Sequence, residues 1–341
     1  MSAQSEADFL TAEIVRLQQR LATITAPAPL PNPTPILAPK KRVPIAFPGV
    51  NIASAEFASD KLPGTMGQTY LYPDDWVITP WAAKGIKLIR IPFLIERVQP
   101  QNHGEFSAPD IAALDRIIAT AAGAGLTVVL DAHNYGQRAG AKMDVGDAPN
   151  FWWRMATRYR NAPHVMFGIM NEPSAWSPVD WQVTLRKCVA GIRVTGAKQT
   201  IMAPGAGWNG AHDFVAGGNA AAFEGFADPN FMVEVHQYLD GDSSGSHLQE
   251  YATGKGAKVL IDVTTWARSK SYKLFLGEFG FAMPSGQVEA TAMLQFMTDN
   301  SDVWAAYAIW AAGQWWGDYA FSTEPDTADK PHLAVLQNFM G

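Results

Sequence analysis

The sequence is poor in cysteine, because Cys188 is the only one among its 341 residues. A single cysteine cannot form a disulfide within the chain, which excludes a disulfide-stabilised scaffold and gives no sign of an oxidising compartment. Cys188 also has no catalytic motif around it, so we expect a packing residue on a helix face. The seven histidines show neither an H-E-x-x-H motif nor a spacing with paired cysteines. We therefore expect no metal and no cofactor.

Long hydrophobic runs and an excess of positive charge are also missing. No apolar run approaches the length of about 18 residues that a membrane span needs, and the N-terminus lacks the basic start and continuous apolar stretch of a secretory signal. The formal net charge is −6, which gives no basic surface for nucleic acid. We expect a neutral partner, no nucleic acid and no membrane span. If the protein works outside the cell, either a signal was removed or export follows another route.

The residues that are present describe a large folded unit. Hydrophobic residues make up 48% of the chain and charged residues 17%, the composition of a globular protein with a sizeable buried core. A length of 341 residues is above that of most single domains, yet some architectures reach about 250 residues or more as one domain. One large domain with a short extension accounts for the whole chain.

The extension is predicted to have two parts. Residues 1–25 form a predicted amphipathic helix, because apolar residues recur at spacings of four and three through residues 3–24 (Ala3, Ala7, Leu10, Ile14, Leu17, Leu21 and Ile24). This seam indicates either a homo-oligomer through residues 3–24, docking on the outside of the main domain, or a partly ordered tail. Residues 26–42 are a predicted proline-rich linker, since their alternating prolines exclude a helix and favour extended chain. The main domain then spans residues 43–341.

Short apolar runs alternate with helical patterns through the main domain. The predicted strands are Ile45–Ile52, Ile86–Phe93, Leu126–His133, Val165–Asn171, Thr200–Ala203, Phe231–His236, Leu274–Glu278 and Trp304–Trp310. The predicted helices are Ala108–Ala124, Pro149–Tyr159, Asp180–Thr195, Ser246–Gly254, Val288–Thr298 and His332–Met340. Alternation of this kind predicts an α/β fold with a parallel sheet, and eight strands suit closure into a (β/α)₈ TIM barrel. An open doubly wound sheet is the alternative.

Polar and aromatic side chains terminate most of these strands. They are Arg90, His133 with Asn134, Asn171 with Glu172, His236 with Tyr238, Glu278 and Trp310. In a barrel, catalytic side chains project from the C-terminal ends of the strands. One such residue is most simply a helix cap or a member of an ion pair, whereas the whole set indicates an active site.

Glu172 and Glu278 are the candidate catalytic pair. Hydrolysis of a glycosidic bond needs an acid that protonates the leaving oxygen and a carboxylate that meets the developing positive charge, about 5 to 5.5 Å apart when configuration is retained. The fourth and seventh strands face each other across a barrel mouth, so both glutamates can reach one bond. A shielded Glu172 beside a second carboxylate should have a raised pKa. A buried ion pair that stabilises the barrel top is the alternative.

The neighbours of the two glutamates suit supporting roles. Asn171 is placed to donate to a sugar hydroxyl, Tyr238 to donate to the nucleophile, and Arg90 to keep Glu278 ionised. Aromatic side chains near the same loops are predicted to bind sugar, because pyranose rings present C–H patches to flat apolar faces. They are Tyr135, Trp208, Trp310, Trp315 and Trp316.

Two other motifs are set aside. Residues 205–210 satisfy a G-x-G-x-x-G pattern after a strand, but Trp208 is too bulky for close approach to a pyrophosphate and no convincing helix or acidic residue follows. Residues 240–245 resemble the start of a calcium loop, but Tyr251 occupies the position of the bidentate glutamate. We interpret the second segment as a turn-rich loop of the active site.

Two motifs carry a resemblance to a known family. Gly168-Ile-Met-Asn-Glu-Pro173 and Gly277-Glu-Phe-Gly280 resemble the acid/base and nucleophile motifs of glycoside hydrolase family 5, also called cellulase family A. The blocks that begin at Arg90, Asp131, Glu234 and Trp310 resemble that family's other strand ends, in the same order. The likeness covers about residues 45–325 and is greatest to bacterial and fungal endo-β-1,4-glucanases.

The resemblance implies a retaining endo-β-1,4-glucanase that acts by double displacement on a β-glucan polysaccharide or oligosaccharide. It implies Glu172 as general acid/base, Glu278 as nucleophile and Trp310 as the floor of the subsite before the cleaved bond. Arg90, His133, Asn171, His236 and Tyr238 are the implied catalytic support, and Asn134 joins the aromatic residues as an expected substrate contact. The alternatives are a β-mannanase, another β-1,4-glycanase or transglycosylase, and a non-catalytic glycan-binding barrel. A secreted protein is expected from this function.

Overall fold

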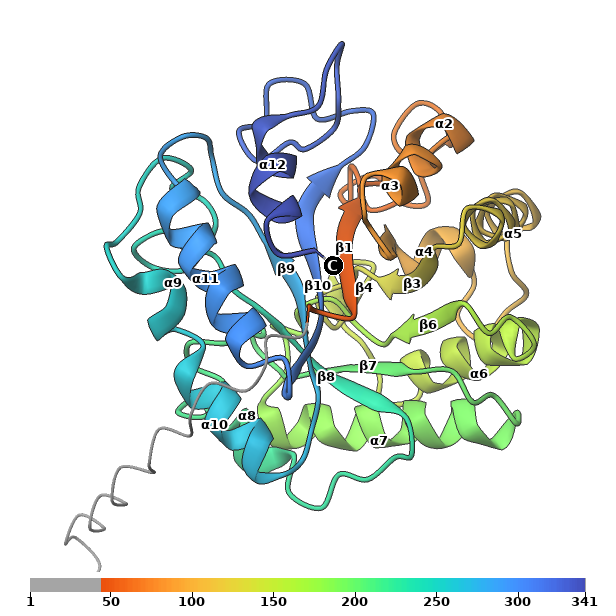
Figure 1. Ribbon diagram of the computed structural model, residues 1–341. Helices are drawn as coiled ribbons and strands as arrows, with labels where there is room; N and C mark the ends of the chain where they lie inside the picture. Colours follow the sequence, from red (N-terminus) through yellow and green to blue (C-terminus); the bar gives the residue numbers. More distant parts are fainter. Residues whose placement is uncertain (1–43, 341) are drawn as a thin grey trace, which may run out of the picture. The chain divides into compact units, whose positions relative to one another are not determined.

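Eight parallel strands close into a barrel. The computed structural model describes residues 44–340, so the predicted helix of residues 1–25 and the whole predicted linker of residues 26–42 lie outside the described residues. The strands are β1 (Phe47–Ile52), β2 (Leu88–Phe93), β3 (Thr127–Ala132), β6 (Val165–Gly168), β7 (Ile201–Pro204), β8 (Phe231–His236), β9 (Leu274–Phe279) and β10 (Trp304–Ala312). Strand β1 pairs in parallel with both β2 and β10 (Figure 1). The predicted (β/α)₈ barrel is confirmed, and the alternative of an open sheet is wrong.

Helices surround the barrel on the outside (Figure 1). The longer ones are α5 (Ala108–Gly123), α6 (Asp147–Tyr159), α7 (Pro178–Val194), α10 (Ile261–Ser269), α11 (Gln287–Asp299) and α12 (Pro331–Gln337). The short ones are α2 (Asp75–Ile78), α3 (Pro80–Ala83), α4 (Ile95–Val98), α8 (Asn219–Ala222) and α9 (Lys255–Lys258). Their apolar faces and the outward side chains of the strands form the main core. No helix in residues 44–340 is long and apolar enough to cross a bilayer.

One predicted helix is wrong. Ser246–Gly254 forms turns, and the helices on this side of the barrel are α9 and α10, which begin later. The buried carboxylate of Asp240 accepts hydrogen bonds from the backbone N–H groups of Gly245 and His247, at 3.0 and 3.1 Å. These side-chain contacts give the backbone an alternative to helical hydrogen bonding. A two-stranded ribbon, β4 (Gln137–Arg138) with β5 (Ala141–Lys142), was not predicted.

The inside of the barrel changes from apolar to charged along the strands. A small cluster of Leu88, Val129, Met166, Met202, Phe275, Ala306 and Ala308 fills one layer. Side chains two residues apart on a strand face the same side, so Arg90 follows Leu88 and Asp131 follows Val129 toward the C-terminal ends. A buried layer of ionisable groups therefore lies directly beneath the barrel mouth.

Candidate active site

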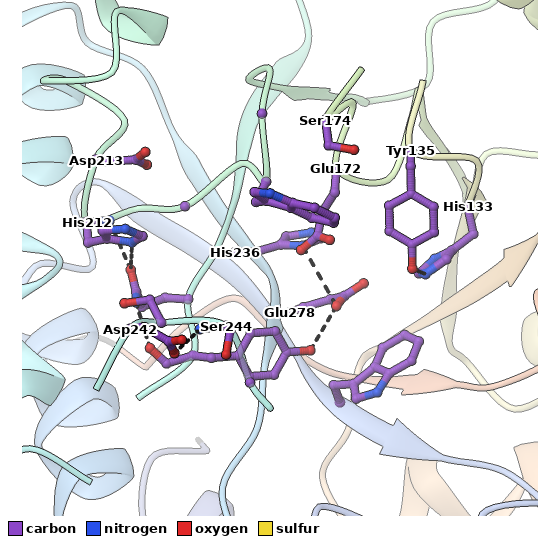
Figure 2. Close-up of a pocket in the computed structure, with 18 of the residues that line it drawn as sticks. His133, Tyr135, Glu172, Ser174, His212, Asp213, His236, Asp242, Ser244 and Glu278 are labelled. Atoms are coloured by element: carbon purple, nitrogen blue, oxygen red, sulfur yellow. Dashed lines mark hydrogen bonds and ion pairs between the residues drawn. The ribbon is translucent and has the colours of Figure 1, made fainter. Parts of the chain in front are cut away.

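A cavity of about 880 Å³ opens at the C-terminal ends of the strands. Its lining includes Glu172, Glu278, His133, His236, Tyr135, Tyr238, Trp208 and Trp310, together with Gln137, Ser174, His212, Asp213, Gln237, Tyr319 and the loop of residues 242–245. Figure 2 shows His133 and Tyr135 on one side of the cavity and His212 and Asp213 on the other. Most of the predicted site residues therefore meet at one place, although they lie far apart in the sequence.

The side chains of Glu172, His236 and Glu278 point toward one another at the centre of the cavity (Figure 2). Nδ1 of His236 lies 2.8 Å from Oε1 of Glu172 and 3.8 Å from Oε2 of Glu278. One oxygen of each glutamate lies within 4.8 Å of the other. Two carboxyl groups this close fit the short spacing of about 5 to 5.5 Å in retaining glycosidases, and they leave no room for the water that inverting enzymes place between them.

The backbone at Glu172 is strained. Its φ is +38°, a left-handed conformation that costs a non-glycine residue on the order of 1 to 3 kcal/mol. The flanking backbone is held on both sides: the Asn171 N–H donates to the carbonyl of Ala132 at 2.8 Å, and the Ser174 N–H donates to the carbonyl of Glu172. Strain of this size is typical of residues whose position is fixed for function.

Arg90 is a buried cation that organises the layer beneath the two glutamates. Its guanidinium lies 2.9 Å from Glu278, 3.1 Å from Asp131 and 3.2 Å from Glu234. It also donates to the side-chain oxygens of Asn51 and Asn171, at 2.9 and 2.8 Å. These contacts all involve the two terminal nitrogens, whereas Nε has no hydrogen-bond partner among the described residues. Ion pairs of this kind stabilise a buried guanidinium, and the guanidinium in turn holds the carboxylate of Glu278 in place.

The surroundings shift the pKa values of Glu172 and Glu278 in opposite directions. Burial raises the pKa of both carboxyl groups, but for Glu278 the positive charges of His236, Arg90 and His133 and a hydrogen bond from Tyr238 outweigh it and lower the pKa below its ordinary value. For Glu172 burial prevails and the pKa stays raised, although His236 lowers it in part. Tyr238 donates to Oε2 of Glu278 at 2.9 Å. The surroundings therefore favour the protonated form of Glu172 and the ionised form of Glu278.

Aromatic rings and His133 form the walls beside this centre. Nε2 of His133 lies 3.3 Å from the hydroxyl of Tyr135, within hydrogen-bond distance, and the imidazole stacks on Trp310 with ring centroids 5.5 Å apart. The ring of Tyr135 makes an edge contact with the ring of Trp208, a residue that is 67% exposed. An exposed indole beside a polar cavity is a surface on which a sugar ring can stack.

The comparisons with known proteins agree with this geometry. Residues 48–313 match the family model for cellulase, glycosyl hydrolase family 5. The chain belongs to glycosyl hydrolase family 5. Among its family 5 relatives, endo-β-1,4-glucanase B of Aspergillus niger is 32% identical over 86% of this chain and 89% of its own length.

Two solved structures of family 5 endoglucanases are also similar. XacCel5A in complex with cellopentaose is 36% identical with a TM-score of 0.84, over 86% of this chain and 99% of that chain. Endoglucanase Cel5A of Pseudomonas stutzeri in complex with cellobiose is 29% identical with a TM-score of 0.79, and the match covers 88% of this chain and 95% of that chain. The expected family is confirmed, and so is the glycoside hydrolase class of the enzyme.

Three predicted substrate contacts lie away from the cavity lining in this family 5 structure. The side chain of Asn134 is buried, receives a hydrogen bond from the Ile95 N–H at 2.8 Å and donates to Glu96 at 2.6 Å. These contacts give Asn134 a structural role at the start of α4. Trp316 packs against Trp310, and Trp315 packs against Phe57, both outside the lining residues.

Sequence reasoning missed part of the site. Asn51, Asp131 and Glu234 pair with Arg90 but were not singled out. Period-two alternation could have identified two of them, because Asp131 and Glu234 stand two residues before His133 and His236 and face the same side of their strands. The lining residues Gln237 and His212 gave no comparable signal; the His212 N–H donates to the Gln237 side chain at 2.9 Å.

Two groups in residues 44–340 have donor atoms close enough to share a cation. One is the centre itself, Glu172 with His236 and Glu278, and the other is Asp240 with Asp242 and His247. In the second group the buried Asp240 carboxylate is already hydrogen-bonded to Ser244, Gly245 and His247. Carboxylate and imidazole ligands would suit a divalent ion, but the proposed chemistry below uses none.

Proposed function

We propose that this family 5 protein is a retaining endo-β-1,4-glucanase with Glu172 as general acid/base and Glu278 as nucleophile. The observation that carries the proposal is the close pair of carboxyl groups near Nδ1 of His236, one with a raised and one with a lowered pKa. Relatives named endo-β-1,4-glucanases and a similar structure in complex with cellopentaose support a β-1,4-glucan as substrate.

The reaction then follows two steps. In the first, Glu172 gives its proton to the glycosidic oxygen while a carboxylate oxygen of Glu278 attacks the anomeric carbon, which breaks the glycosidic bond and leaves a covalent glycosyl-enzyme. In the second, Glu172 takes a proton from water, whose oxygen attacks the same carbon and releases Glu278. Inversion at each step gives net retention of configuration.

The surroundings of the pair suit each step. Arg90 and Tyr238 hold Glu278 with an oxygen toward the cavity, and both favour its ionised form. Asn171 lies beside Glu172, and its side-chain oxygen is bound by Arg90, which leaves the amide N–H₂ as a donor for a sugar hydroxyl. The exposed face of Trp208 gives a stacking surface for a sugar ring at one end of the cavity.

The test measures release of reducing sugar from carboxymethyl cellulose, with mannan as the parallel substrate. We expect activity on cellulose, and a loss of at least about 10³-fold in Glu278→Ala, because this variant lacks the carboxylate that is proposed to form the covalent intermediate. Glu224→Ala serves as the matched control, since Glu224 is an exposed partner of Lys270 and its removal should leave the rate unchanged. Wild-type activity in Glu278→Ala would refute the assignment, and preference for mannan would change the substrate.

Glu172→Ala separates the acid from the nucleophile. An aryl cellobioside with a good leaving group needs little protonation, so we expect this variant to release a burst of phenol and then turn over slowly, because the second step lacks its base. On carboxymethyl cellulose it should be inactive. Equal losses on both substrates, without a burst, would contradict the role of Glu172 as acid.

We further propose that the enzyme acts outside the cell. A β-1,4-glucan polymer is too large to enter through a bilayer, so hydrolysis must begin where the polymer lies. Assay of carboxymethyl cellulose hydrolysis in the medium and in the washed cells of the source organism tests this proposal. Activity confined to the cells would overturn it.

A further inference from the structure

Glu234 is a buried carboxylate that the reaction described above does not use. It lies on β8 two residues before His236, and its side chain is completely buried. Oε1 lies 3.2 Å from the guanidinium of Arg90 and 3.3 Å from Nε2 of His236. The other oxygen has no hydrogen-bond partner among the described residues. A carboxylate buried at this cost of desolvation calls for an explanation.

His236 stands between Glu234 and the proposed acid. Its Nδ1 faces Glu172 at 2.8 Å, with Glu278 at 3.8 Å, and its Nε2 faces Glu234. The charged and titratable groups around the imidazole are therefore these three carboxyl groups, with Arg90 behind Glu234. A carboxylate oxygen beside a ring nitrogen is an acceptor for a proton on that nitrogen, so the contact with Glu234 favours a proton on Nε2.

The packing of β9 shows that the Glu234–His236 contact is built into the fold. Val235 pairs with Leu276 and His236 pairs with Glu278, so Gly277 is an extra residue that forms a bulge. A Cβ atom at Gly277 would overlap Oε1 of Glu234 and lie 2.8 Å from Nε2 of His236. Only glycine leaves room for this pair of side chains.

We propose that Glu234 is a positioning residue for the acid/base step: its carboxylate holds a proton on Nε2 of His236, so that Nδ1 presents a second proton to Glu172. His236 is then an imidazolium ion in the free enzyme. Its charge faces Glu172 throughout the reaction, orients the carboxyl group and stabilises the carboxylate that remains after the proton has left. The kinetic part of this inference rests on the proposed function, whereas the state of His236 does not.

The electrostatics of the site support the geometry. Burial alone would lower the pKa of His236, but Glu278, Glu172 and Glu234 outweigh it and raise the pKa to about 10. Around Glu172, burial raises the pKa, His236 and His133 lower it, and Glu278 raises it. The imidazolium of His236 is the largest influence that favours loss of the Glu172 proton. Loss of that positive charge should therefore make Glu172 a weaker acid.

The first experiment measures the protonation of His236 directly by ¹⁵N NMR of histidine-labelled protein between pH 5 and 9. In the wild type we expect both imidazole nitrogens of His236 to stay protonated to pH 8 or above. In Glu234→Gln the imidazolium should titrate at a pH lower by about one to three units, because a neutral amide replaces the carboxylate.

Asp131→Asn is the matched control. Asp131 also faces Arg90, at 3.1 Å against 3.2 Å for Glu234, but it contacts His133 at 2.8 Å and not His236. Both variants therefore remove one negative charge beside the same guanidinium. We expect the titration of His236 to change in Glu234→Gln and to keep its wild-type value in Asp131→Asn.

The second experiment follows kcat/KM against pH on a soluble cello-oligosaccharide. In the wild type, kcat/KM falls at high pH because Glu172 loses its proton. In Glu234→Gln this alkaline limb of the profile should shift to higher pH by about one unit. In Asp131→Asn, which weakens only the smaller influence of His133 on Glu172, the limb should move less. A rate that falls equally at every pH, without movement of the limb, would mean that Glu234 only stabilises the fold.

Other outcomes also decide the inference. A neutral His236 in the wild type at pH 6 would overturn it, even if Glu234→Gln does not fold. An identical His236 titration in wild type and Glu234→Gln would do the same. A wild type that carries the imidazolium but hydrolyses no glucan would instead refute the proposed function, because the NMR measurement needs no substrate.

Discussion

At the scale of single residues, the hydroxyl of Tyr238 is a sensitive test of how Glu278 is kept ionised. Tyr238 donates to Glu278 and so contributes to its lowered pKa. In Tyr238→Phe the pKa of Glu278 should rise, so the acid limb of kcat/KM moves to higher pH. At the optimum we expect a loss of about 10- to 100-fold, the value of a hydrogen bond to a charged group.

The direction of this shift in the acid limb follows from the form of Glu278 that is active. The nucleophile must be ionised, so activity is present above its pKa and falls as the pH drops through it. Tyr135→Phe is the matched control, because its hydroxyl is bonded to His133 in the same cavity. A profile from pH 3 to 9 on a cello-oligosaccharide distinguishes the two. An acid limb that does not move in Tyr238→Phe would show that Arg90 and the histidines suffice.

Most site residues were predictable because strand ends meet at one edge of the barrel. Position at the end of an apolar run was enough to predict Glu172, Glu278 and His236 as site residues. Asn134 lies outside the cavity lining because it follows His133 directly, and neighbouring residues on an extended chain point to opposite sides. The hydrogen bonds of Asn134 to α4 depend on the fold of a different segment, which no local pattern reveals.

At the scale of elements, the bulge in β9 makes Gly277 the most constrained position near the site. In Gly277→Ala the added methyl group overlaps the Glu234–His236 pair, so both side chains must move. Overpacking of a buried site costs about 1 to 3 kcal/mol, and misplacement of groups near the reaction costs on the order of 10²-fold in rate. We expect a lower Tm and a loss of activity of about that size.

Gly123→Ala provides the comparison. Gly123 is the last residue of α5, and a Cβ there would have open space around it. Alanine is favoured over glycine in a helix by about 0.5 to 1 kcal/mol, so this variant should be as stable as the wild type or slightly more stable. Thermal unfolding and the cellulose assay on both variants test the prediction. Wild-type activity in Gly277→Ala would show that the strand can shift without disturbing the site.

The same scale shows where sequence patterns fail. All eight strands were predicted, because continuous apolar runs bounded by polar residues are typical of buried parallel strands. Ser246–Gly254 was wrongly predicted as a helix, while α10 at Ile261–Ser269 was missed. The turn geometry after β8 depends on the Asp240 carboxylate and its contacts across several residues. Tertiary contacts of this kind override weak helical periodicity.

At the scale of the whole molecule, closure of the barrel determines which side chains meet at the active site. Closing the sheet brings Glu172, after β6, and Glu278, at the end of β9, to the same mouth, while the interior beneath them carries Arg90 with Asp131 and Glu234. The apolar layer inside the barrel packs beneath these charged side chains and supports them. Alternation and strand count were sufficient to predict this arrangement, whereas the composition of the charged layer depends on which side chains the closed barrel brings together.

The chain before residue 44 offers a separate prediction at this scale. The apolar seam of residues 3–24 and the proline-rich segment of residues 26–42 indicate a self-association helix on an extended spacer. If this is so, light scattering should give a larger mass for the full chain than for a chain that begins at Lys41. Both should hydrolyse carboxymethyl cellulose at the same rate per active site, because the proposed catalytic residues all belong to residues 44–340.

Variants within the seam make the comparison specific. Leu10→Asp with Leu17→Asp places two charges among apolar positions and should give the monomer mass, because a buried seam cannot accommodate unpaired carboxylates. Gln19→Asp, outside the seam, should keep the mass of the full chain. Identical monomer masses for all of these proteins would exclude self-association, and would leave docking on the barrel surface as the role that the apolar spacing supports.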